Sequence, residues 1–123
     1  MLEPLHAYLL LAQAAWDNPA YASAYNVGPD KPATVREVLQ LARAAYGEGE
    51  IDFASEPEGP HEAGLLALDA SKIRQQLGVV PRWDLATSVS RTMQWYKDFA
   101  AGVSAADLCD RDLHHYWLSK TTN

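Results

Sequence analysis

Apolar residues recur at helical spacing in several segments of this 123-residue chain, and this periodicity limits its fold more than any other feature. From Pro4 to Asp17 they recur every three or four positions, which predicts an amphipathic helix with proline in its first turn. Thr34 and Glu37 form the pattern of a capping box, so a second helix is predicted from Thr34 to the residue before Gly47. Further helices are predicted from Asp69 or Ser71 to Gly78, from Asp84 through Ala101 and from Ser104 towards Lys120.

Three short runs between these segments predict strands. Residues 24–27 end at a Gly-Pro pair, residues 51–54 precede a loop rich in proline, and residues 65–68 are apolar throughout. The predicted order is helix, strand, helix, strand, strand and three helices, which indicates a mostly helical α/β lobe. Strands this short and few do not make an independent sheet, so we expect a further part of the fold to be missing.

Length and composition indicate one soluble domain over residues 1–123. Hydrophobic residues make up 48% and charged residues 21% of the chain, and no run approaches the roughly 20 apolar residues that a membrane span needs. The net charge of -6 argues against nucleic-acid binding. Cys109 is the only cysteine and the first residues lack a signal-peptide pattern, so the sequence predicts a cytoplasmic protein without disulfides.

Several sequence motifs could indicate catalysis or metal binding, but the sequence around each of them does not fit that function. Tyr116 and Lys120 have the Tyr-x-x-x-Lys spacing that lets a lysine lower the pKa of a phenol, but no glycine-rich dinucleotide turn accompanies them. His61 has no second histidine four residues later, which excludes a zinc-hydrolase helix. His114 and His115 would point about 100° apart on a helix and would not readily share a metal. The sequence therefore predicts no catalytic residue and no metal site in this chain.

Three runs of the sequence, residues 2–12, 25–29 and 61–96, resemble a known family. They are similar to the C-terminal half of extended short-chain dehydrogenases that act on nucleotide sugars. The Leu-Glu-Pro-Leu opening and the His-Glu-Ala run are most similar to the CDP-glucose 4,6-dehydratases. The resemblance implies a substrate-binding lobe whose Rossmann half, with the NAD site and the catalytic tyrosine and lysine, is missing. No cofactor is then expected in this chain itself.

Four residues are candidates for substrate contacts. Asn26 matches the asparagine of the family's Tyr-Asn-x-Gly strand end, which implies a hydrogen bond to the phosphate or sugar of the substrate. His61 and Glu62 match the start of the family's variable substrate-side loop. Arg82 could hold a pyrophosphate through its forked guanidinium, whereas we expect the adjacent Trp83 to pack against the last helices.

The chain alone is expected to bind CDP-glucose weakly and to be inactive, because such an enzyme gathers binding energy from both walls of its cleft. Two alternatives stay open. The chain could be the lobe of another nucleotide-sugar dehydratase or epimerase. It could also be a free-standing interaction module, including a homo-oligomer, in which surfaces that a Rossmann half would cover bind another chain.

Overall fold

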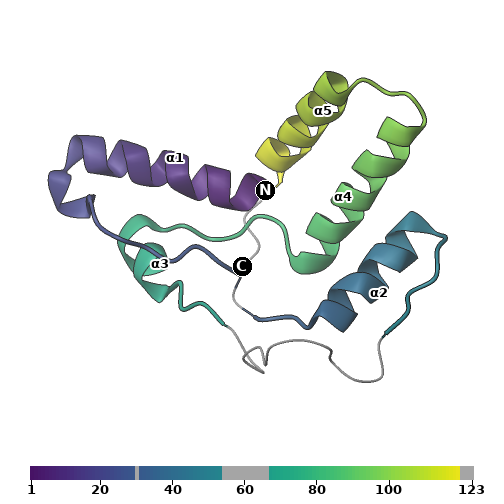
Figure 1. Cartoon of the computed structure of the whole chain (residues 1–123). Coiled ribbons are helices and arrows are strands. Elements are labelled where there is room, and N and C mark those ends of the chain that lie inside the picture. The colour runs from purple at the N-terminus through teal and green to yellow at the C-terminus, as the bar shows by residue number, and fades with distance from the viewer. Residues whose placement is uncertain (30, 54–66, 120–123) are drawn as a thin grey trace.

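A computed structural model describes residues 1–29, 31–53 and 67–119. Every regular element within these ranges is a helix. Figure 1 shows α1 and α3 on one side and α2, α4 and α5 on the other, with the start of α1 lying between the two groups. The elements are α1 (Leu2–Asp17), the 3-10 helix η1 (Pro19–Tyr21), α2 (Val35–Tyr46), α3 (Ser71–Leu77), α4 (Leu85–Ala100) and α5 (Ala105–Leu118).

The prediction of an α/β lobe with three short strands is wrong, because the described ranges contain no strand. Residues 24–27 are irregular and lie near residues 68–70, where Asn26 Nδ2 donates to Asp69 O over 3.1 Å. No backbone hydrogen bond between the two segments accompanies this contact in the described part of the chain. A strand requires a ladder of such bonds, and residues 51–53 also lack one. The remainder of the second and third predicted strands, at residues 54, 65 and 66, lies outside the described ranges.

The five predicted α-helices are confirmed, and local signals begin α2 and α4, whereas α1, α3 and α5 begin without a side-chain capping hydrogen bond. Thr34 Oγ1 accepts from Glu37 N over 3.1 Å while the Glu37 carboxylate accepts from Thr34 N over 2.7 Å, which completes the predicted capping box. Gly47 ends α2 with a left-handed φ of 93°, a conformation that glycine adopts without strain. Asp84 accepts from Thr87 N over 2.8 Å and so begins α4.

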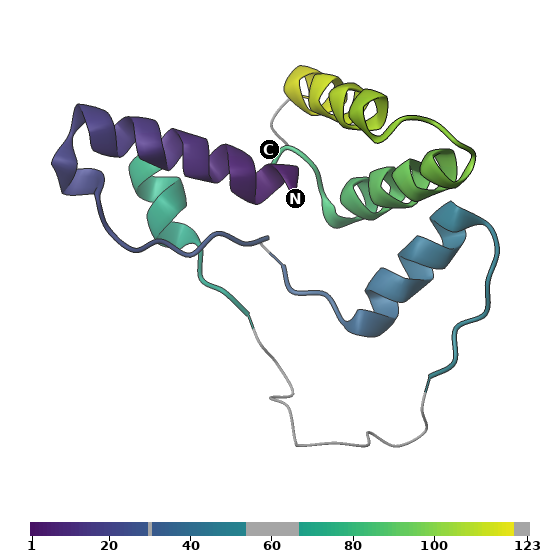
Figure 2. The same cartoon turned by 45° about the horizontal axis from the view of Figure 1, so that its top comes forward.

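Few side chains are buried in the described part of the chain. One buried cluster is formed by Ala7, Ala70 and Ile73, and the other buried residues lie on α4 and α5. Two ion pairs, Arg91 with Asp112 and Arg111 with Asp98, also connect α4 to α5. Figures 1 and 2 both show α2, α4 and α5 stacked in the order α2, α4, α5. The buried residues are Ala7, Ala70, Ile73, Val89, Leu108 and Tyr116.

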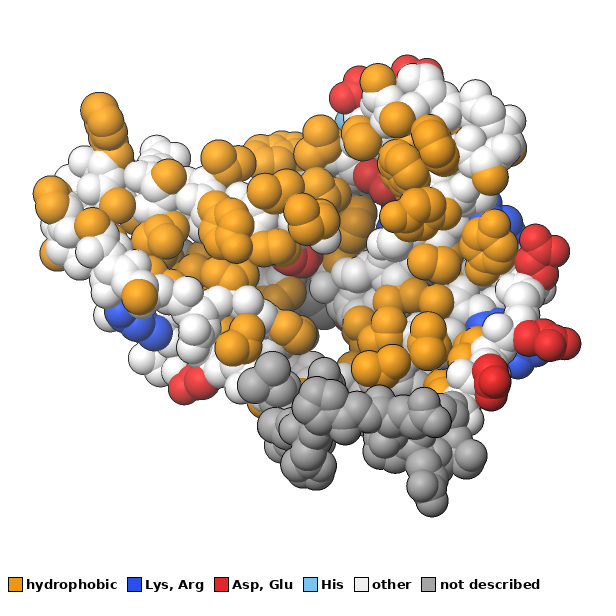
Figure 3. All heavy atoms as spheres, in the orientation of Figure 1, with side chains coloured by type: hydrophobic (Ala, Val, Ile, Leu, Met, Phe, Trp, Pro, Cys, Tyr) orange, Lys and Arg blue, Asp and Glu red, His pale blue; other side chains and the backbone are white. Residues whose placement is uncertain are grey.

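Much apolar surface is left uncovered. Leu9, Trp16 and Trp117 are 71%, 89% and 70% exposed. Figure 3 shows apolar side chains gathered over α1 and over the α4 and α5 side. Val35 and Leu39 of α2 are also exposed. No helix in the described ranges is long and apolar enough to cross a membrane.

Candidate substrate site

Asn26 is exposed, and contacts within the chain orient its side-chain amide. Its Nδ2 donates to Asp69 O, just before α3. The same segment is held to α3 by Lys72, whose Nζ donates to Ser23 Oγ over 2.8 Å and to Ala24 O over 2.9 Å. Asn26 therefore belongs to a segment that is held against α3 by the hydrogen bonds of Lys72, a residue of that helix.

Arg82 lies elsewhere and is half-buried. Its Nη1 donates to Trp117 O over 3.2 Å and to Ser119 O over 3.3 Å, at the carbonyl end of α5. A cation at this position is stabilised by the helix dipole and by the unpaired carbonyl groups of the last turn. The structure therefore uses Arg82 to hold the end of α5, and it does not bring Asn26 and Arg82 into contact. The other two predicted site residues, His61 and Glu62, lie outside the described ranges.

Glu3 connects three separate parts of the chain. Its Oε1 accepts from the backbone N–H groups of Arg82, over 2.9 Å, and Trp83, over 2.7 Å. Its Oε2 accepts from the hydroxyl of Tyr116 over 2.9 Å. Trp83 Nε1 in turn donates to Ser119 Oγ over 2.8 Å, and its ring meets the Tyr116 ring edge to face at 5.2 Å. Trp83 therefore packs against the end of α5, and we call these five residues the Glu3 node.

The sequence interpretation missed Glu3. It is the only acidic residue in the first turn of α1, where an acid ordinarily needs no explanation beyond the helix dipole. Its partners lie 79, 80 and 113 residues away, so no local pattern could reveal them. The one available signal is that Glu3 and Asp17 are the only charged residues of an otherwise uncharged helix.

The environment of Tyr116 disfavours ionisation of its phenol. Its side chain is 4% exposed, and burial, followed by the hydrogen bond and the charge of Glu3, raises the pKa of the Tyr116 hydroxyl. A catalytic phenol of the Tyr-x-x-x-Lys type needs the opposite shift. The hydroxyl therefore stays protonated at neutral pH and acts as a donor to Glu3. Lys120 lies outside the described ranges.

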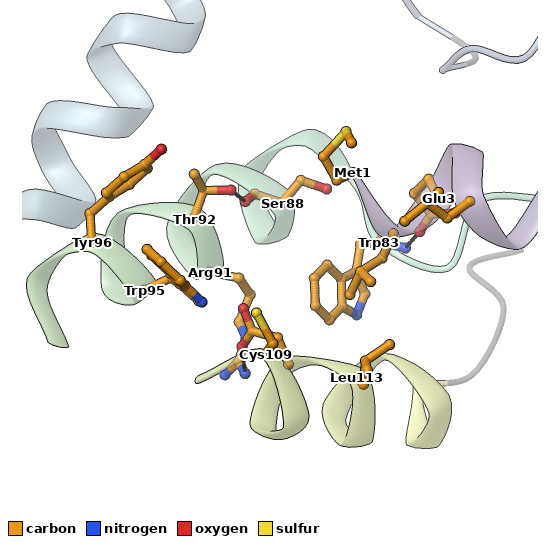
Figure 4. Close-up of a pocket in the computed structure, with 13 residues that line it drawn as sticks. Met1, Glu3, Trp83, Ser88, Arg91, Thr92, Trp95, Tyr96, Cys109 and Leu113 are labelled. Atoms are coloured by element: carbon orange, nitrogen blue, oxygen red, sulfur yellow. Dashed lines mark hydrogen bonds and ion pairs between the residues drawn. The ribbon is translucent and has the colours of Figure 1, made fainter. Parts of the chain in front are cut away.

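Two cavities adjoin the Glu3 node. The one in Figure 4, of about 460 Å³, lies between the start of α1, α4 and α5 and is lined by Trp83, Trp95 and Leu113, with the Arg91 and Asp112 ion pair at its wall. Such a lining suits an apolar or aromatic group. The described residues contain no group of three or more metal-ligating side chains, here or elsewhere.

The second cavity, of about 340 Å³, is the one that borders the predicted site. It is lined by Val27 and Gly28, which follow Asn26, and by Pro81 and Trp83, which flank Arg82. Arg74 of α3 also reaches it. Chain neighbours of Asn26 and of Arg82 thus line the same cavity.

Comparison with known proteins confirms the resemblance. No protein-family model matches the chain. The chain is 33% identical, over 99% of its own length, to CDP-glucose 4,6-dehydratase of Salmonella typhimurium, of which the match covers 34%. It is also 34% and 30% identical to the dTDP-glucose 4,6-dehydratases of Streptomyces antibioticus and Streptomyces griseus, over 60% and 58% of its length and 22% of theirs. The chain is thus homologous to part of these enzymes and spans about a third of the length of the CDP-glucose enzyme.

Proposed function

We propose that this chain is the nucleotide-sugar-binding portion of a CDP-glucose 4,6-dehydratase and that it is inactive alone. The observation that carries the proposal is the identity of 33% along nearly the whole chain, to a third of that enzyme. The match covers 34% of that enzyme, and none of the seven glycines of the sequence lies in the glycine-rich pattern of a dinucleotide-binding turn. The NAD-binding portion and its catalytic residues are therefore the partner that we expect the chain to need.

The proposed role of Asn26 follows from its hydrogen bond. Because Nδ2 already donates to Asp69 O, the acceptor Oδ1 and one N–H remain for a ligand. A sugar hydroxyl can both donate to Oδ1 and accept from the remaining N–H, whereas a phosphate oxygen can only accept from the N–H. We expect Asn26 to contact the hexose, and Arg82 to shape the neighbouring cavity by holding the end of α5.

Binding of the isolated chain tests this proposal. In isothermal titration, CDP-glucose should bind weakly, because only one wall of the cleft is present, and NAD should not bind. Asn26→Ala should weaken CDP-glucose binding by about tenfold, the effect of roughly 1.4 kcal/mol expected for a lost hydrogen bond. The matched control is Gln75→Ala, an exposed amide on α3, which should leave binding unchanged. Sub-micromolar NAD binding, or turnover of CDP-glucose by the chain alone, would refute the proposal.

The similarity to two dTDP-glucose 4,6-dehydratases supports a second candidate, a lobe that binds dTDP-glucose. The first candidate is favoured because the match to the CDP-glucose enzyme covers 99% of the chain, against 60% or less for the dTDP-glucose enzymes. Melting temperatures measured with each sugar nucleotide separate the two, because a ligand that binds the folded state stabilises it. A larger shift with dTDP-glucose would favour the second candidate.

A further inference from the structure

The segment that carries Asn26 is not held in place by a backbone ladder. Residues 24–27 are irregular, and no backbone hydrogen bond joins them to residues 68–70 in the part of the chain that the structure describes. Fixing the backbone of such a segment costs conformational entropy, which other contacts must offset. The orientation of Asn26 therefore depends on the side chains that reach this segment.

Two side chains from one face of α3 hold the residue before Asn26. Lys72 and Gln76 are four positions apart, which makes them neighbours on the surface of the helix. The Lys72 Nζ lies 4.4 Å from the centre of the Tyr25 ring, and Gln76 Oε1 accepts from the Tyr25 hydroxyl over 2.8 Å. Tyr25 is thus held at its ring face by a cation and at its hydroxyl by an amide.

The ammonium group of Lys72 also bonds to the two residues before Tyr25. It donates to Ser23 Oγ over 2.8 Å and to Ala24 O over 2.9 Å, which engages two of its three N–H donors. Hydrogen bonds from a charged donor are stronger than those between neutral groups, and a cation over an aromatic ring adds to them. Lys72 therefore contacts three consecutive residues immediately before Asn26.

The amide of Asn26 has a weaker anchor of its own. Its Nδ2 donates to Asp69 O over 3.1 Å, a single hydrogen bond between neutral groups at an exposed position. Such a bond contributes little by itself, so it orients the amide well only when the preceding residues are already fixed. We propose that Lys72 is a positioning residue, which holds residues 23–25 against α3 and so keeps the Asn26 amide in its orientation for the sugar nucleotide. This inference rests on the proposed function, in which Asn26 contacts CDP-glucose.

A lysine near a sugar nucleotide could instead bind a phosphate of the ligand directly. The geometry favours positioning, because the Lys72 ammonium is directed at Ser23 and Ala24 of its own chain. The two roles predict different coupling to Asn26. A positioning residue acts through Asn26, so its substitution should have no further effect on binding once Asn26 is lost, whereas the loss of a direct contact should add to the loss of Asn26.

Nuclear magnetic resonance of the whole chain without ligand tests the positioning. Lys72→Met keeps an unbranched side chain and removes the ammonium donors. The side-chain amide protons of Asn26 should then shift towards those of a solvent-exposed asparagine and exchange faster with water, because their hydrogen bond to Asp69 O is held less firmly. Lys97→Met is the matched control, since Lys97 is also exposed and its Nζ also lies near a tyrosine ring, 5.9 Å from the centre of Tyr46.

The control should leave the Asn26 amide signals unchanged. Unchanged signals in Lys72→Met, or equal changes in both variants, would overturn the proposal. Circular dichroism checks that each variant keeps its helices.

A double-mutant cycle with CDP-glucose tests the consequence for binding. In isothermal titration, Lys72→Met should weaken binding by up to about tenfold, and no more than Asn26→Ala does. Lys72→Arg, which keeps a charged donor beside the ring, should restore most of the affinity. In the Asn26→Ala background, Lys72→Met should have no further effect, and a further loss there would overturn the proposal in favour of a direct contact.

Failure of the proposed function gives a different result. In that case the original chain does not bind CDP-glucose, or Asn26→Ala leaves binding unchanged. The Asn26 amide signals of the chain without ligand still decide whether Lys72 positions that side chain.

Discussion

Helices α2 and α3 differ in a way that separates local from long-range determinants of this fold. Helix α2 has a complete capping box and a left-handed glycine at its end, yet none of its residues is buried. Helix α3 has seven residues and no side-chain cap at its N-cap Ala70, yet its Ile73 is only 2% exposed. Local signals thus mark both ends of α2, but they do not determine which helix lies in the core.

Long-range contacts explain the burial of α3. Ile73 packs with Ala7 of α1, and Tyr25 and Val27 lie against the same cluster. Tyr25 also donates its hydroxyl to Gln76 over 2.8 Å, across 51 residues of sequence. Helix α2 packs on α4, and this contact is the most extensive one between helices in the described part of the chain, yet it leaves no residue of α2 buried. The difference between the two helices is therefore that α3 encloses a side chain in the core, whereas α2 packs without enclosing one.

The largest expected effect is at Ile73. Ile73→Ala should lower the free energy of unfolding by about 3 kcal/mol, because it removes buried methylene groups and leaves a cavity. The matched change in α2 is Leu39→Ala, which should cost less than about 1 kcal/mol because Leu39 is 37% exposed. Urea unfolding measures both values. Similar decreases in the free energy of unfolding at the two positions would contradict the proposed difference between α3 and α2.

The second prediction concerns the long-range contacts of the Glu3 node. It uses a substitution that leaves the volume of the side chain almost unchanged. Glu3→Gln should lower the free energy of unfolding by about 2 kcal/mol, because the amide cannot accept all three hydrogen bonds. Glu48→Gln, at an exposed position, is the control and should change it little. Urea unfolding followed by tryptophan fluorescence is suitable, since Trp83 belongs to the node. No difference between the two variants would mean that the node contributes nothing to stability.

The smallest effect is expected at the N-cap of α2. Thr34→Ala removes the hydroxyl that accepts from Glu37 N and should lower the free energy of unfolding by about 1 kcal/mol. Ser104→Ala is its control, because Ser104 is the N-cap of α5 but makes no side-chain capping hydrogen bond. Thermal melts of the two variants sharpen the comparison. A larger loss for Ser104→Ala would show that the local signals of α2 have been overestimated.

Much of the helical framework could be predicted because its signals lie within a few residues of each other. The cap of α4 at Asp84 and the end of α2 at Gly47 are examples. The strands could not be predicted correctly, because a strand depends on a partner chain segment and residues 24–27 have no backbone partner among the described residues. Of the candidate site, the role of Asn26 in substrate contact stays a prediction, and the structure adds that the residues following it line a cavity. The contacts of Arg82 with the end of α5 could not be inferred from its neighbours in the sequence.

The sequence by itself determined that the chain forms five α-helices and where α2 and α4 begin, and it revealed the relationship to nucleotide-sugar dehydratases. Only the tertiary structure decided that Glu3 joins α1 to the end of α5, that α3 and not α2 enters the core, and that one side of α1 stays exposed. Helix ends depend on hydrogen bonds over three or four residues, which a sequence displays directly. Burial depends on which distant segments meet, and that is settled only when the whole chain has folded.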